Sequence, residues 1–198
     1  MIKLHQKQYN FKHKRIHETI RCQRNFDWNS PIDPEHLEIL DEYVQKPGQQ
    51  QGEHCVTVFK IHNNFEKVNE LNKQLKTENE QVLAPLVYVW TSDRTKDDKN
   101  FFFAGFHSGM VSKVANDLGY QTGFCLCDTG REFDYDVAWR LWCNDNGLEG
   151  PHYHNLEFIL SIGHPEPGKD YNDNGSYTDK PDDDHEHYTY NWSELKEL

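Results

Sequence analysis

Residues 99–119 read KNFFFAGFHSGMVSKVANDLG, and this stretch decides the fold. Large apolar side chains recur in it at intervals of three and four residues, at Phe103, Phe106, Met110, Val114 and Leu118. This period predicts an α-helix over residues 99–118. Another side of the helix carries only small residues, at Gly105, Ser108, Gly109 and Ser112. Small side chains let a second helix approach closely. We therefore expect this helix to be central, with Gly119 ending it.

Further helices and strands flank this central helix in the sequence. Asp33, Pro34 and Glu35 provide an N-cap, a first-turn proline and a first-turn acid, which predict a helix over 34–45. The apolar run at 86–90 predicts a strand that is buried on both faces. The other expected helices cover part of 6–20, 64–76 and 135–145, the last burying Ala138, Leu141 and Trp142, and the other expected strands cover 54–61, 123–127 and 156–162. This order predicts an α+β layered domain rather than strict βαβ alternation.

The composition limits the classes of function. The chain has 198 residues, a formal net charge of -12 and 35% hydrophobic residues. A surface this acidic argues against general nucleic-acid binding, and no apolar run is long enough to span a membrane. Five cysteines, an odd number at low density, favour a reducing cytoplasm over a disulfide scaffold. We expect one domain over 1–165 and an acidic extension over 166–198.

A compact pair of basic residues lies at Arg21 and Arg24, within Arg21-Cys22-Gln23-Arg24-Asn25-Phe26. Each guanidinium offers a planar fork of donors that suits a phosphate group. Surface salt bridges are the alternative role for such a pair. The surrounding basic segment, residues 1–24, has seven Lys/Arg and one Glu. It either binds an anion locally or lies against the acidic residues 165–198.

Four motifs in this order resemble the nitroreductase family of FMN enzymes. Residues 21–26 are similar to its Arg-Ser-x-Arg-x-Phe, and residues 47–53, PGQQQGE, to its Pro-Ser-x-x-Asn-x-Gln loop. Residues 104–119 resemble its central helix, which ends in Leu-Gly-Leu. Residues 160–165, LSIGHP, resemble its last core strand, which ends in Gly-Tyr-Pro. The resemblance covers about residues 10–165. It implies a nitroreductase-like fold, with a mostly antiparallel sheet flanked by helices.

The resemblance also implies a function. The family passes a hydride from NADH or NADPH through FMN to a nitroaromatic, a quinone or a related small acceptor. It implies a homodimer, with FMN in a groove between the subunits. Since the flavin carries the redox chemistry, we expect no separate catalytic side chain.

The residues that match the motifs become candidate FMN ligands. Arg21 and Arg24 would hold the phosphate or the ribityl chain, and Cys22 stands where the family commonly has serine, beside Gln23. Gln51 and Glu53 would lie near the flavin ring, where a carboxylate at 53 would lower the flavin potential. The backbone of Gly123, Phe124, Cys125 and Leu126 would face the flavin N5, and Lys180, or Lys169, would add a basic group from the extension.

Two other functions remain open from the sequence alone. One is a flavin-binding or flavin-processing relative without nitroreductase turnover. The other is a non-catalytic acidic protein whose extension engages a basic partner. The pairs His152/His154 and His185/His187 have no third ligand fixed by spacing, so we expect no metal site. We expect Cys125, His107, Trp90, Trp139 and Trp142 to be packing residues.

Overall fold

The computed structural model describes residues 23–45, 56–75, 82–92, 99–126, 134–148 and 155–168. The helices in this part are α1 (Pro34–Gln45), α2 (Phe65–Gln74), α3 (Lys99–Asp117) and α4 (Tyr135–Asp145), and the strands are β1 (Val56–His62), β2 (Leu86–Ser92), β3 (Gln121–Leu126) and β4 (Asn155–Gly163). Every element predicted within the described ranges is confirmed, with boundaries that agree or differ by one or two residues. The helix predicted within 6–20 and nearly all of the extension lie outside the described residues.

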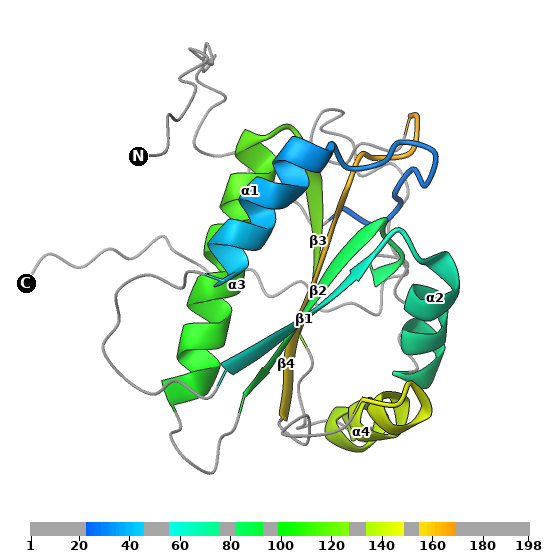
Figure 1. Ribbon diagram of the computed structural model, residues 1–198, viewed down its shortest axis with the longest axis vertical. Coiled ribbons are helices and arrows are strands. Elements are labelled where there is room, and N and C mark those ends of the chain that lie inside the picture. Colours follow the sequence, from blue (N-terminus) through cyan, green and yellow to red (C-terminus); the bar gives the residue numbers. More distant parts are fainter. Residues whose placement is uncertain are drawn as a thin grey trace, which may run out of the picture.

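The four strands form one sheet in the order β1-β2-β4-β3, and all neighbouring pairs are antiparallel. The predicted antiparallel sheet is thus confirmed. Figure 1 shows the sheet between two helical layers, with α1 and α3 on one side and α2 and α4 on the other. Every residue of the central strand β2 is buried, as its unbroken apolar run predicted. None of the described helices combines the length and the apolarity needed to cross a bilayer.

The layer formed by α2 and α4 covers a core of large side chains. Trp139 and Trp142 stack with their ring centroids 5.3 Å apart, and both are buried, which confirms the prediction for them. The prediction for Leu141 is wrong, because its side chain is 48% exposed. The buried face of α4 consists of residues 138, 139, 142 and 143. At 100° per residue, Leu141 points about 130° away from the centre of that face.

Helix α3 packs on the sheet through its small residues. Ala104, Ser108 and Ala115 are fully buried, and a Cβ added to Gly105 would lie 3.2 Å from Cζ of Phe158 on β4. The small side of α3 therefore meets a strand of its own subunit, where the sequence predicted a second helix. A Cβ at Gly109 would meet no atom within 4 Å among the described residues. Gly119 ends the helix with a φ of 95°, as predicted.

Three large apolar residues of α3 are exposed, whereas Val111 of the same helix is fully buried. Phe102, Phe106 and Met110 are 64%, 55% and 37% exposed. They follow one another at intervals of four residues, so they form a stripe along the helix. On the neighbouring helix α1, Ile39 and Tyr43 are also exposed. We call these five residues the apolar stripe.

Candidate functional site

Residues 23–27, which we call the strap, contain the second arginine of the predicted anion site. The amide of Gln23 donates to the Thr122 carbonyl on β3 at 2.8 Å, and the amide of Asp27 donates to the His164 carbonyl, just after β4, at 2.9 Å. The amide of Glu166 donates to the Asn25 carbonyl at 3.1 Å, and Phe26 and Pro165 pair in an isolated antiparallel β-bridge. The strap is therefore held by backbone hydrogen bonds at the corner where β3 starts and β4 ends.

Buried side chains fix the strap further. Gln23 is fully buried, and its Nε2 donates to the Asn25 carbonyl at 2.7 Å. Phe26 is 3% exposed and lies against Gly163, where an added Cβ would be 3.0 Å from Cδ1 of Phe26 and 3.0 Å from Cδ of Pro85. The absence of a side chain at Gly163 leaves room for the Phe26 ring at the end of β4. These contacts leave the Arg24 backbone little freedom to move.

Arg24 carries a polar group without an acceptor. Its Nε is buried and has no hydrogen-bond partner among the described residues. Buried donors in native proteins are almost always paired, and a guanidinium stays charged at all physiological pH values. The side chain thus fits an anionic ligand with several acceptor oxygens, of which a phosphate monoester is one.

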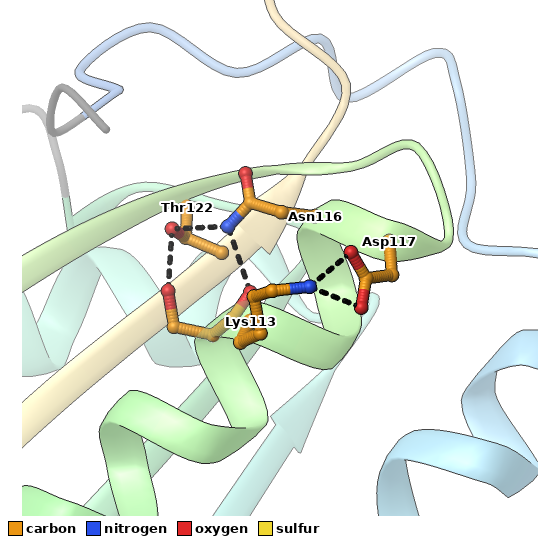
Figure 2. Close-up of polar contacts among 5 residues, drawn as sticks. Lys113, Asn116, Asp117 and Thr122 are labelled. Atoms are coloured by element: carbon orange, nitrogen blue, oxygen red, sulfur yellow. Dashed lines mark hydrogen bonds and ion pairs between the residues drawn. The ribbon is translucent and has the colours of Figure 1, made fainter. Parts of the chain in front are cut away.

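A polar cluster ties α3 to the start of β3, next to the strap (Figure 2). The hydroxyls of Ser112 and Thr122 are 2.9 Å apart, and Nδ2 of Asn116 donates to the Ser112 carbonyl at 2.7 Å and to Oγ1 of Thr122 at 3.4 Å. Lys113 and Asp117 form an ion pair on the exposed side of the helix. Thr122 is also the residue whose carbonyl holds the strap. Sequence reasoning missed Thr122 and Asn116; the available signal was the polar pair 112 and 116, four residues apart near the end of an apolar helix.

Tyr120 packs at the same corner, where β3 starts and β4 ends. The Tyr120 hydroxyl accepts a hydrogen bond from the Asp33 amide at 3.0 Å and lies 2.9 Å from Nδ1 of His36. Its ring contacts the His164 ring at 4.8 Å. Burial is the main cause that raises the pKa of Tyr120, so its hydroxyl stays neutral. Tyr120 therefore links the start of α1, the start of β3 and the residue that holds the strap.

The other described candidates lie along β3. Gly123 and Cys125 are buried, and the partly buried Phe124 ring contacts Phe158 at 5.2 Å. The burial of Cys125 confirms its predicted packing role. Strand β3 is an edge of the described sheet, and it runs away from the strap toward Leu126. The structure thus brings together Gln23, Arg24 and the start of β3.

The remaining candidate ligands, Arg21, Cys22, Gln51, Glu53 and Lys180, lie outside the described residues. The described residue that follows 51 and 53 is Val56, at the start of β1. Strand β1 is the opposite edge of the sheet. His62 near its end is aligned with Thr122 across the four strands, through the paired residues Leu86 and Ile162. Val56 lies six residues before His62 on the same strand. From the usual strand spacing and rise, Val56 and Thr122 are roughly 20–25 Å apart. The start of β1 and the corner that holds the strap are therefore far apart within one subunit.

The predicted histidine pairs also lie outside the described part of the chain. Within it, no three His, Cys, Asp or Glu side chains are grouped so that they could hold a metal ion. His107 is packed, as predicted, and is 8% exposed.

Comparison with known proteins identifies the fold. No protein-family model and no curated protein sequence matches the chain. Among solved structures, an FMN-dependent nitroreductase from Clostridium difficile R20291 superimposes with a TM-score of 0.63 at 20% identity, covering 83% of this chain and 94% of that one. A nitroreductase with bound FMN from Bacteroides fragilis gives a TM-score of 0.61 at 16% identity, covering 75% and 86%. The chain has the nitroreductase fold, as the sequence motifs predicted.

A third similar structure is the NADPH:FMN oxidoreductase from Vibrio harveyi in complex with NAD+. Its TM-score is 0.56 at 15% identity, and the match covers 74% of this chain but only 65% of that one. At these identities the likeness concerns the fold.

Proposed function

We propose that the protein is an FMN-dependent oxidoreductase that transfers a hydride from NADH or NADPH, through the flavin, to a small acceptor such as a nitroaromatic or a quinone. Its fold is that of enzymes described as FMN-dependent nitroreductases. The single observation that carries the proposal is the buried Nε of Arg24, which lacks an acceptor within the described residues. It occurs in the motif that suggested a phosphate site from the sequence.

The chain would bind and orient the cofactor with few side chains. Arg24, together with Arg21, would hold the phosphate, and the hydrogen bonds of the strap would keep Arg24 in place. The backbone of β3 from Gly123 to Leu126 would lie along the ring system. When bound, FMN supplies the hydride chemistry itself.

A second copy of the chain would complete the site. Val56, the first described residue after Gln51 and Glu53, lies on the edge strand opposite β3 and the strap. We therefore assign Gln51 and Glu53 to the site of the partner copy. The apolar stripe supports such a pairing, because exposed apolar residues gathered on one surface commonly mark an interface.

Absorbance spectroscopy tests the function. The protein, purified or reconstituted with FMN, is expected to show a flavin spectrum that bleaches when NADH or NADPH is added without oxygen, and that returns when a quinone follows. A protein that holds FMN but is bleached by neither nucleotide would contradict the proposed turnover. A protein that cannot be loaded with FMN would contradict the proposed cofactor.

A further inference from the structure

Two oxidisable side chains lie in contact beneath α1 and α3. Tyr88 and Trp90 are alternate residues of β2, so they share the face of the sheet that these two helices cover. Their ring centroids are 5.9 Å apart with an interplanar angle of 66°. Tyr88 is 1% exposed and Trp90 is fully buried. No part of the proposed flavin site uses either of them.

Each of the two rings donates its one polar hydrogen to a base. The Tyr88 hydroxyl donates to Oδ1 of Asp41 at 2.7 Å, and Nε1 of Trp90 donates to Nδ1 of His107 at 3.2 Å. Nε2 of His107 lies 3.0 Å from the Tyr43 carbonyl, which can only accept. His107 therefore carries its proton on Nε2, and its Nδ1 lone pair faces the indole.

The proton acceptor of Tyr88 is connected to solvent. Oδ2 of Asp41 forms an ion pair with Lys60 at 2.6 Å, and the two side chains are 25% and 39% exposed. Burial, with Asp41 as the second cause, raises the pKa of the Tyr88 phenol far above its ordinary value. Tyr88 therefore does not give up its proton alone at ordinary pH. It can give it up together with an electron.

We propose that Trp90 and Tyr88 form a relay that passes an oxidising equivalent from Trp90 to Tyr88, with each proton moving along a hydrogen bond that is already formed. A one-electron oxidising radical, such as the azide radical, takes one electron from Trp90 and becomes the azide anion. The Nε1 proton of Trp90 moves to Nδ1 of His107, which leaves a neutral indolyl radical beside an imidazolium.

The second step returns Trp90 to its starting state. One electron passes from Tyr88 to Trp90, the proton on His107 returns to Nε1 of Trp90, and the phenolic proton of Tyr88 moves to Asp41. In total, the oxidant gains one electron, Asp41 gains one proton, and a tyrosyl radical remains at Tyr88. An external one-electron reductant, such as a thiol, can then restore Tyr88.

The same arrangement does not occur at the other buried aromatic residues that the structure describes. Nε1 of Trp139 and Nε1 of Trp142 are buried without an acceptor in the described part of the chain, so oxidation there has no local base. Tyr120 has a hydrogen-bond partner, but its ring contacts are His36 and His164 rather than a tryptophan. Tyr120 is thus a matched control for Tyr88, since it too is buried.

Pulse radiolysis with the azide radical, which takes electrons preferentially from tryptophan, tests the relay without any flavin. In the wild-type protein the tryptophanyl absorption is expected to decay as the tyrosyl absorption rises, with one rate that does not depend on protein concentration. Tyr88→Phe keeps the aromatic ring but should lose this kinetic phase of electron transfer from tyrosine to tryptophan. Tyr120→Phe should retain the kinetic phase. A Tyr88→Phe protein with the wild-type phase would overturn the proposal.

A second variant tests the proton step and does not depend on the fold of Tyr88→Phe. Asp41→Asn replaces a carboxylate by a much weaker base of similar shape, so the phase should slow by about tenfold or more. In the wild-type protein the rate should also fall in D2O, because a proton moves with the electron. An unchanged rate in Asp41→Asn would contradict the assignment of Asp41 as acceptor and so overturn the relay. A wild-type rate that is equal in the two solvents would do the same.

Discussion

The two helical layers differ in where they place their large side chains. The layer of α2 and α4 turns Trp139 and Trp142 toward the sheet. The layer of α1 and α3 turns small residues such as Ala104 and Ser108 toward the sheet and leaves Phe102 and Phe106 outside. The first layer thus stabilises the subunit itself. The second layer brings α3 close to the sheet and leaves an exposed apolar surface that a second molecule can cover.

The largest effect is expected in the first layer. Trp139→Ala removes a fully buried ring that contacts both Trp142 and Phe59. The free energy of unfolding should fall by about 3–5 kcal/mol, as measured by urea denaturation at a fixed protein concentration. A loss below 1 kcal/mol would show that this layer does not carry the stability assigned to it.

The end of β4 should respond to a change of one methyl group. Gly163→Ala places a Cβ 3.0 Å from both Phe26 and Pro85, so the chain must shift there. We expect a loss of about 1–3 kcal/mol in unfolding free energy, together with weaker FMN binding because the strap moves. The matched control is Gly109→Ala, where the added Cβ meets nothing within 4 Å and the helix should gain up to about 1 kcal/mol. Equal stability of the two variants would refute the close packing at Gly163.

The second layer is tested through assembly. Phe106 is 55% exposed, so Phe106→Glu should change the unfolding free energy of a single subunit by no more than about 0.5 kcal/mol. If the apolar stripe is the interface, this charge should convert a dimer into monomers in analytical ultracentrifugation. Leu141→Glu on α4, at a side chain 48% exposed, is the control and should leave the dimer intact. A Phe106→Glu protein that sediments as the wild-type dimer would place the interface elsewhere.

A further effect concerns the pH dependence of stability through the core under α4. Burial raises the pKa of the Cys143 thiol from 9.0 to about 11. Above pH 9 the unfolded chain loses the thiol proton while the folded protein still keeps it, so the free energy of unfolding falls as the pH rises from 9 to about 11. Below pH 9 the thiol is neutral in both states and the full stability is present. Cys143→Ala should flatten the decline of stability over that window, as measured by chemical denaturation at several pH values. A decline as steep as that of the wild-type protein would contradict the burial of this thiol.

The sequence predicted the elements well because each has a local signal. Asp33, Pro34 and Glu35 start α1, and the unbroken apolar run starting at Leu86 forms a strand that is buried on both faces. It predicted less well which side of a helix is inside. On α3 the predicted apolar period includes Phe106 and Met110, which are exposed. The space between helix and sheet at Gly105, beside Phe158, leaves little room for a side chain. On α4, Leu141 fits the apolar period but falls outside the arc that contacts the sheet.

The site was predicted in part for the same reason. Arg24 carried a visible motif, so a local pattern and a family resemblance could mark it as a candidate phosphate ligand, but not its place at the corner of β3 and β4. The support beneath it depends on contacts between distant residues, such as Gln23 with Thr122 and Tyr120 with His36. No spacing pattern in the sequence predicts those contacts, because they form only when the sheet is assembled.

Titration of the apoprotein with FMN, followed by flavin fluorescence, tests the central claim most directly. Arg24→Ala should bind FMN about 10- to 150-fold more weakly than the wild-type protein, which corresponds to about 1.5–3 kcal/mol for a charge-assisted hydrogen bond. The control is Arg140→Ala, which removes a guanidinium from α4, in the layer that α4 forms with α2. The Nε of Arg140 donates to the Asp136 carbonyl, and its removal should leave the FMN affinity unchanged. Wild-type FMN affinity in Arg24→Ala would contradict the account, because the phosphate would then be bound by other groups.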